Sequence, residues 1–377
     1  MPQPKNPPDA VTDEGASDFA SPDAAGSPKV TAVIPAYNMA AYIERALRSA
    51  IGQTYANLDI LVIDDGSGDD TARIAQAIAE RHANVRVVTT ENAGVAAARN
   101  LGTQMADSLY VAYLDADDLW HPLKIERQVA ALAAHGHSVE WGSCYTLYRM
   151  IDPDDAVIDD GVSSHERGDF FAEHLVWNPV GNGSNLLVRR DLALAVEGFN
   201  PDYAAAGIGG CEDLEFQLKL LLRSKMELVR EFLVGYRLHA AQMSGDIVMM
   251  RLSKLAVIET IVAGRDMPPA TRKRALVQAY LTLAKGHFLM GSWGAAAKSI
   301  VAGLAAGPIE TARKFEIFLR QELDYWTARS RHQLQSSARP PGVTRPFGEF
   351  APGEGVDADS RNRVRHRNSL ASRRKRS

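Results

Sequence analysis

The sequence is poor in cysteine and has neither a long apolar run nor an excess of positive charge. Cys144 and Cys211 are the two cysteines among 377 residues, which is too few for a disulfide framework and suits a reducing compartment. No apolar run approaches the ~20 residues that cross a bilayer, and residues 1–28 lack the charged and apolar regions of a secretory signal. The net charge of -4 provides no basic field for nucleic acid. We therefore expect a cytoplasmic globular protein that binds no specific nucleic acid.

Two common phosphate-binding motifs are also absent. The turn after the first predicted strand reads PAYN (residues 35–38) and contains no Gly-x-Gly-x-x-Gly. The second predicted strand is followed by GSG (residues 66–68), but Asp69 and Asp70 come next and would repel a pyrophosphate at a helix start. The chain has no Walker lysine motif either. These absences argue against a dinucleotide-dependent enzyme and against a P-loop nucleotidase.

Short apolar runs alternate with amphipathic helical patterns along the first third of the chain. The runs at residues 30–34, 58–63, 85–88 and 109–114 predict four strands, and the stretches between them have apolar residues at helical spacing. This alternation is typical of right-handed βαβ units. It predicts an α/β fold with a mostly parallel sheet and helices on both faces. The aromatic and β-branched run at residues 138–150 is expected to pair at the edge of this sheet.

Acidic or amide residues follow three of these four strands. Asp65 follows the second, Asn92 the third, and Asp115 and Asp117 the fourth. In an open parallel sheet the carboxyl ends of the strands share one edge, where ligands bind. Three carboxylates within residues 115–118 are costly to bury unless a divalent cation such as Mg2+ or Mn2+ compensates them. From the residues alone, the alternative is a solvated acidic turn that caps the next helix.

Four motifs occur in a fixed order along the chain: VIPAYN (33–38), VIDDGS (62–67), NAG with ARN (92–100) and LDADD (114–118). Together they resemble family 2 glycosyltransferases of the GT-A fold. The similarity extends over roughly residues 29–245. It implies a Rossmann-like GT-A domain that binds a nucleotide-sugar donor, usually a UDP-sugar.

The resemblance implies roles for residues around the donor. Pro35, Ala36 and Tyr37 would bind the nucleotide, with the Tyr37 ring stacked on the base. Asp65 would accept the imide N–H of the base, and Arg99 would meet the base or the phosphates. From the residues alone, Tyr37 could equally be a half-buried aromatic residue, Asp65 a capping residue and Arg99 a member of a surface ion pair.

The resemblance also implies a metal site between the donor and the acceptor. Asp115 would contact the ribose, and Asp117 would hold Mg2+ or Mn2+ against the diphosphate. His239, in the segment YRLH (236–239), would supply a further contact to the metal or the diphosphate. The alternative for a single histidine is a structural role.

A second acidic stretch, GGCEDLEF (209–216), is identified with the catalytic base of the family. Asp213 would be the base, and Glu212 would position it or bind the acceptor. Ser184 and Asn185, in a small-residue stretch before a predicted strand, would lie on the acceptor side. The alternatives are a tight glycine turn near residue 184 and, for the two acids, a first helical turn that the helix dipole favours.

The motif Gln-x-x-Arg-Trp of processive family members is missing, since Gln217 is followed by LKLL. The resemblance therefore implies an inverting, metal-dependent, non-processive transfer of one sugar to a saccharide, lipid-linked or protein acceptor, in glycan or cell-envelope biosynthesis. One alternative is a catalytically inactive nucleotide-sugar-binding or scaffold protein. Another is a nucleotidyltransferase, which would be expected to carry a glycine-rich, basic phosphate loop after the first strand.

The ends of the chain differ in composition from the middle. Residues 1–28 are rich in Pro, Asp, Ala, Ser and Gly and are expected to be disordered. Residues 246–330 predict a helical region with one hairpin like a tetratricopeptide unit at 275–308. Residues 331–377 predict a disordered tail that ends in a basic segment, suited to peripheral contact with the inner face of a membrane. A solvated disordered end is the alternative.

Overall fold

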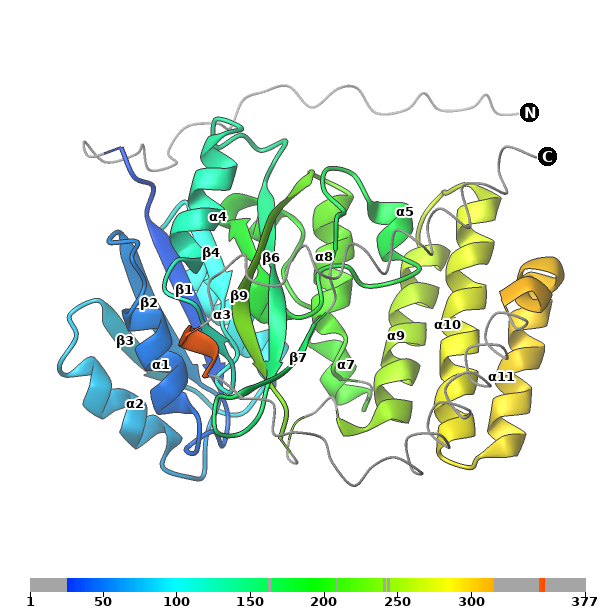
Figure 1. Cartoon of the computed structure of the whole chain (residues 1–377), viewed down its shortest axis with the longest axis horizontal. Helices are drawn as coiled ribbons and strands as arrows, with labels where there is room; N and C mark the ends of the chain where they lie inside the picture. Colours follow the sequence, from blue (N-terminus) through cyan, green and yellow to red (C-terminus); the bar gives the residue numbers. More distant parts are fainter. Residues whose placement is uncertain are drawn as a thin grey trace, which may run out of the picture.

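The computed structural model describes residues 26–161, 164–207, 209–239, 242, 245–314 and 346–349. Within them, one sheet carries helices on both faces, and a row of three further helices stands beside it (Figure 1). The two segments predicted to be disordered, 1–28 and 331–377, lie almost entirely outside the described residues. The predicted domain boundaries at residues 28, 245 and 330 stay predictions.

Nine strands form the sheet in the described part of the chain. They are β1 (Val30–Ala36), β2 (Leu58–Asp64), β3 (Val85–Thr89), β4 (Tyr110–Tyr113), β5 (Leu119–Trp120), β6 (Ser143–Ile151), β7 (Val157–Asp160), β8 (Leu187–Arg189) and β9 (Met226–Arg237). Their order in space is β3-β2-β1-β4-β8-β6-β9-β5, with β7 paired to β6. The four strands predicted near the N-terminus correspond to β1, β2, β3 and β4.

Most of these strands run in the same direction. β1 pairs in parallel with β2 and β4, β2 with β3, and β6 with β9. β8, β5 and β7 run antiparallel to their neighbours. The mostly parallel α/β sheet is therefore confirmed. The edge position expected for residues 138–150 is wrong, because β6 lies between β8 and β9 and is buried at nearly every position.

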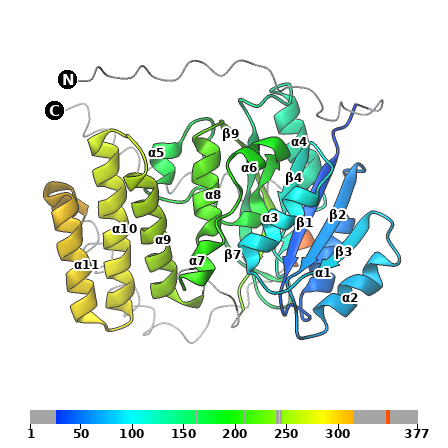
Figure 2. The ribbon, with the colours of Figure 1, turned by 180° about the vertical axis from the view of Figure 1, so that it is seen from behind.

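Helices cover both faces of the sheet. They are α1 (Ile43–Ile51), α2 (Thr71–Ala79), α3 (Val95–Met105), α4 (Lys124–Ala133), α5 (Phe171–His174), α6 (Arg190–Ala195), α7 (Asp202–Ala205), α8 (Glu212–Leu221), α9 (Ile247–Ala263), α10 (Pro269–Leu289) and α11 (Trp293–Ala306), with short 3-10 helices η1 (Gly183–Asn185) and η3 (Phe347–Glu349). Seen from behind, α3 and α6 lie in front of the strands (Figure 2).

The alternation of side chains along β1 explains why two cores form. Ala32 and Ile34 pack in the core that contains residues of α1 and α4, whereas Val33 packs in the core that contains residues of α3, α6 and α8. Successive residues of a strand point to opposite faces, so an apolar strand such as β1 requires a helical layer on each side. This arrangement fixes the carboxyl ends of β1, β2 and β4 relative to α3 and α8.

The C-terminal helices pack against α8. Leu214 and Leu218 of α8 share a core with Ile258 of α9 and Ala279 of α10. α9, α10 and α11 stand side by side in both views (Figures 1 and 2). No described helix is both long enough and apolar enough to cross a bilayer.

The contact between α3 and β1 gives a prediction about stability. A Cβ atom on Gly102 of α3 would lie 2.3 Å from Cγ1 of Val33, a stiff β-branched residue inside the sheet. Gly102→Ala should therefore lower the free energy of unfolding by about 1–3 kcal/mol, measured by chemical denaturation. Gly294→Ala on α11, where no atom lies within 4 Å of the added Cβ, is the matched control and should not destabilise the protein. Equal stability of the two variants would contradict the close packing.

Candidate active site

A cavity of about 620 Å³ opens at the carboxyl ends of β1, β2 and β4 and at the start of α8. It brings together, along with Asn92, nine of the residues to which the resemblance gave roles: Pro35, Ala36, Tyr37, Asp65, Arg99, Asp115, Asp117, Glu212 and Asp213. The two acidic stretches, about a hundred residues apart in the chain, thus face the same space.

Arg99 of α3 joins the two acidic stretches. Its Nη2 lies 2.5 Å from Oδ1 of Asp115, and its Nη1 lies 2.9 Å from Oε1 of Glu212. The side chain is only 4% exposed, so the surface ion pair considered from the sequence is not what the structure shows. Burial opposes the charge of Arg99, but the carboxylates of Asp115 and Glu212 outweigh it and raise its pKa. Arg99 is therefore a permanent cation between two acids.

The acidic loop after β4 is held by hydrogen bonds from other parts of the chain. The hydroxyl of Ser184 accepts a bond from the N–H of Asp115 (3.0 Å) and donates one to the carboxylate of Asp118 (2.6 Å). The other carboxylate oxygen of Asp118 accepts the N–H of Arg237 at 2.9 Å. Asp118 is almost completely buried, and its pKa is raised by burial and by Asp117. These bonds fix the loop, so Asp118 has a structural role.

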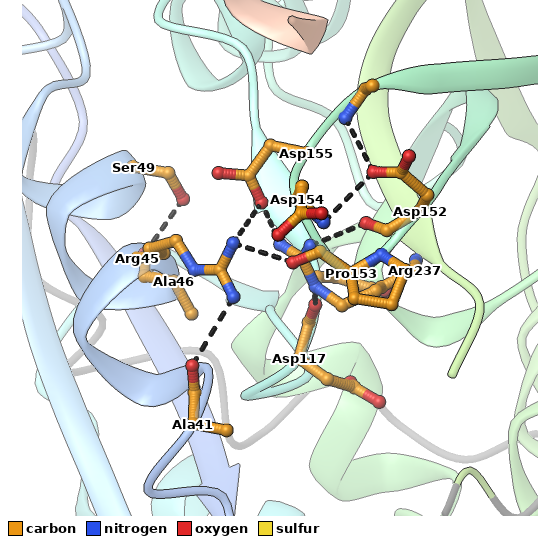
Figure 3. A network of polar contacts seen from close by, with 12 residues as sticks. Ala41, Arg45, Ala46, Ser49, Asp117, Asp152, Pro153, Asp154, Asp155 and Arg237 are labelled. Atoms are coloured by element: carbon orange, nitrogen blue, oxygen red, sulfur yellow. Dashed lines mark hydrogen bonds and ion pairs between the residues drawn. The ribbon is translucent and has the colours of Figure 1, made fainter. Parts of the chain in front are cut away.

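Arg237, at the end of β9, holds the same loop from the other side (Figure 3). Its Nε donates to the carbonyl of Asp117 at 2.6 Å, and its Nη1 donates to the carbonyl of Asp152 at 2.8 Å. Asp155 forms ion pairs with both Arg237 and Arg45 of α1. Figure 3 shows the carboxylate of Asp117 pointing away from this network, which leaves it available to the cavity.

Asp117 lines the cavity and contacts His239, which is not among the lining residues. Oδ2 of Asp117 lies 2.9 Å from Nε2 of His239. Burial is the main reason that the pKa of Asp117 is raised, and the negative charge of Asp115 raises it further. His239 partly opposes this shift. The described residues contain no group of three or more His, Cys, Asp or Glu side chains arranged to hold a metal. A carboxylate with one imidazole fits a Mg2+ or Mn2+ ion that takes its other ligands from substrate phosphates and water.

Asp65 supports the neighbouring loop as well as lining the cavity. Its two carboxylate oxygens accept the N–H groups of Ala93 and Gly94, each at 2.8 Å. The side chain of Asn92 donates to the carbonyl of Asp65 at 3.0 Å. Gly94 precedes α3 with φ +88°, which glycine adopts without steric cost. Asp65 therefore supports the loop before α3, and its predicted contact with a base stays a prediction.

Tyr37 lies at the mouth of the cavity. Its side chain is 48% exposed although it is large and aromatic. An exposed aromatic face beside a cavity is suited to stacking on a planar ring. The neighbouring Pro35 and Ala36 line the same wall.

The start of α8 carries the second acidic pair. Glu212 accepts the N–H of Gly210 at 3.0 Å through the oxygen that does not meet Arg99. Asp213 faces the cavity, and Oδ1 accepts the N–H of Leu214 at 2.7 Å. Burial and the charge of Glu212 raise the pKa of Asp213 to about 7, although Arg99 opposes the shift. A carboxylate with a pKa near neutrality is suited to general base catalysis.

Ser184 and Asn185 do not line the cavity. Both are fully buried; Ser184 holds the acidic loop, and Nδ2 of Asn185 donates to the carbonyl of Val180 at 2.5 Å. Asn182 lines the cavity instead, and its amide has no hydrogen-bond partner among the described residues. The sequence singled out the right stretch, but it has no signal that distinguishes Asn182 from Asn185.

Comparison with known proteins gives matches over much of the chain. The family model for glycosyl transferase family 2 matches residues 31–192. An uncharacterized glycosyltransferase of Haemophilus influenzae is 30% identical over 231 residues, which are 58% of this chain and 68% of that protein. Chondroitin synthase of Escherichia coli is 35% identical over 134 residues, and this match covers 36% of the chain but only 19% of that longer protein.

Solved structures show the same fold. The mannosyltransferase PcManGT of Pyrobaculum calidifontis, in complex with GDP-Man and Mn2+, has a TM-score of 0.55 and 22% identity, covering 82% of this chain and 85% of that one. S. aureus TarS 1–349 in complex with UDP-GlcNAc has a TM-score of 0.54 and 17% identity, covering 73% and 81%. The GT-A architecture predicted from the sequence is therefore confirmed.

Loss of Arg99 should destabilise the protein. Arg99→Met leaves Asp115 and Glu212 without their shared cation, which we expect to cost about 3–5 kcal/mol of unfolding free energy, measured by chemical denaturation. Arg99→Lys keeps the charge but cannot bridge both acids, so its free energy of unfolding should lie between those of Arg99→Met and the wild type. Arg73→Met, which removes an exposed ion pair with Asp70, is the control and should change stability little. A stability of Arg99→Met equal to that of the control would contradict the bridging role.

Proposed function

We propose that this chain, which belongs to glycosyl transferase family 2, is an inverting, metal-dependent glycosyltransferase that transfers one sugar per binding event. The observation that carries the proposal is the single cavity shared by Asp117 and Asp213, with Arg99 between the two acidic stretches. A donor held at one side of this cavity and an acceptor at the other would leave the reacting centre next to Asp213.

The donor side of the proposed site is formed by the ends of β1 and β2. Tyr37 would stack on the base, Asp65 would accept its imide N–H, and Asp115 would bind the ribose. Asp65 retains acceptor capacity, because a carboxylate can accept about four hydrogen bonds and two are used. An imide N–H is a feature of uracil, so we propose a UDP-sugar as the donor.

Asp117 and His239 are the proposed residues for a divalent cation, Mg2+ or Mn2+. Bound there against the donor, the cation would act as a Lewis acid that stabilises the charge of the departing diphosphate. Both Nη atoms of Arg99 are engaged by Asp115 and Glu212, so we assign Arg99 to positioning these two acids rather than to direct binding of phosphate.

Asp213 is the proposed base. Its carboxylate accepts the proton of an acceptor hydroxyl while that oxygen forms a bond to the anomeric carbon of the donor. The bond between this carbon and the diphosphate oxygen breaks, and the nucleoside diphosphate leaves from the opposite face. One displacement with one base inverts the configuration. Glu212 is fixed by Arg99 and Gly210 and so holds the first turn of α8 in place.

The biological setting is also a proposal, which family membership supports. We propose transfer to a saccharide, lipid-linked or protein acceptor in glycan or cell-envelope biosynthesis, in the cytoplasm or at the inner face of the membrane. The basic tail proposed for membrane contact lies outside the described residues.

An inactive nucleotide-sugar-binding or scaffold protein is the second candidate. A cavity that holds Asp213 with a raised pKa beside Asp117 favours an active enzyme. Release of UDP from UDP-sugars with Mn2+ or Mg2+ is the discriminating assay.

The raised pKa of Asp213 predicts a pH dependence. Only the deprotonated carboxylate accepts a proton, so kcat/KM should rise about tenfold per pH unit below pH 7 and level off above it. Asp213→Asn should abolish transfer while donor binding is kept, as measured by calorimetry with UDP. A variant Asp213→Asn with wild-type turnover would overturn the assignment of the base.

Asp117 should act at the donor step. Asp117→Ala removes the proposed carboxylate ligand, so both transfer and the Mg2+-dependent binding of UDP should fall at least tenfold, an estimate for loss of one charged ligand. Calorimetry with UDP, with and without Mg2+, measures the second effect. Asp213→Asn is the matched control, because it removes an acid of the same cavity from the other stretch. Unchanged Mg2+ dependence in Asp117→Ala would place the cation elsewhere.

A further inference from the structure

α9 contributes to the cavity although it lies beyond the segment that matches the family model. Met250, Arg251 and Lys254 of this helix line the cavity together with Asp213. Oγ of Ser253 donates to the carbonyl of Gly209 at 2.9 Å, which ties α9 to the turn before α8. The position of α9 is therefore fixed relative to the proposed base.

Two cations lie one helical turn apart on the cavity side of α9. Residues three positions apart share a helix face, so Arg251 and Lys254 are neighbours. Nη1 of Arg251 donates to the carbonyl of Thr282 in α10, which fixes its side chain. Lys254 makes no hydrogen bond or ion pair within the described part of the chain. Burial, with the charge of Arg251, lowers the pKa of Lys254 although Cys211 opposes the shift.

Lys254 is partly buried. Removing a cation from water without an acidic partner costs free energy, and an anionic ligand would offset that cost. The acids of the cavity form no ion pair with Lys254. Asp115 and Glu212 meet Arg99, and Asp117 meets His239. Asp213 lines the same cavity, where its Oδ1 accepts the N–H of Leu214. The two cations lie on the helix tied to the turn that carries Asp213, whereas the proposed base-binding wall belongs to β1. An anion at α9 would therefore belong to the acceptor rather than to the nucleotide.

We propose that Arg251 and Lys254 form a subsite for an oxyanion of the acceptor, a phosphate or a carboxylate, beside the hydroxyl that Asp213 deprotonates. The proposal rests on the proposed function and adds the chemical class of the acceptor. The acceptor is anionic, and its charged group binds at α9 while a neighbouring hydroxyl attacks the donor sugar.

The test compares acceptors that differ only in the anion. Glycerol is paired with glycerol 3-phosphate, and methyl glucoside with methyl glucuronide, so the two pairs distinguish phosphate from carboxylate. The wild type should use the charged member of at least one pair about tenfold to a hundredfold more efficiently. Lys254→Gln and Arg251→Gln should remove this preference, so that the charged and neutral members of each pair are used equally. Lys298→Gln, an exposed lysine on α11, is the control and should keep it.

Binding provides the second measurement. Saturation-transfer NMR with UDP and Mg2+ present should detect glycerol 3-phosphate or methyl glucuronide on the wild type but not on Lys254→Gln. Equal use and equal binding of charged and neutral members by the wild type would overturn the proposal. So would a raised donor KM with unchanged acceptor preference in Lys254→Gln, which would assign the cations to the diphosphate. Absence of donor hydrolysis in the wild type would count against the proposed function, while the binding comparison would still decide the subsite.

Discussion

The ion pairs of Arg99 hold the site together. A guanidinium that is 4% exposed reaches Asp115 after β4 and Glu212 at the start of α8, although these acids are distant in the chain. Two carboxylates directed at one small cavity repel each other, and burial increases this repulsion because the local dielectric constant is low. A single fixed cation between them allows the sheet edge and α8 to approach each other. The remaining acids, Asp117 and Asp213, can then face the cavity with raised pKa values.

Hydrogen bonds from other parts of the chain hold the closely spaced acids of residues 115–118 in place. Asp118 is fixed by the hydroxyl of Ser184 and the N–H of Arg237, and the carbonyl of Asp117 is fixed by the side chain of Arg237. These contacts come from η1 and β9, so two separate segments hold one loop of four residues. Hydrogen bonds to charged groups are among the stronger ones in proteins, and fully satisfied buried networks give a single conformation. The loop therefore presents Asp117 in one orientation.

Much of the fold was predictable from the sequence because it depends on local patterns. Apolar runs of four to six residues predicted β1 to β4, and the acids after them predicted the edge at which the cavity lies. The central position of β6 was not predictable in this way, because strand order depends on contacts between distant segments. The roles of Arg99, Ser184 and Asn182 were missed for the same reason. Arg99 and Ser184 are defined by contacts with residues distant in the chain, and Asn182 by an amide that has no partner among the described residues. The contribution of α9 lay outside every motif.

The packing of α8 has a consequence for how the chain can be divided. The helix that carries Asp213 at its start buries Leu214 and Leu218 against α9 and α10. A shortened chain that stopped at residue 245 would keep every group proposed above to be catalytic, yet it would expose this apolar surface to water and release the turn at Gly209 from Ser253. We therefore expect the motif-bearing half and the helical half to unfold together, because each covers apolar surface of the other.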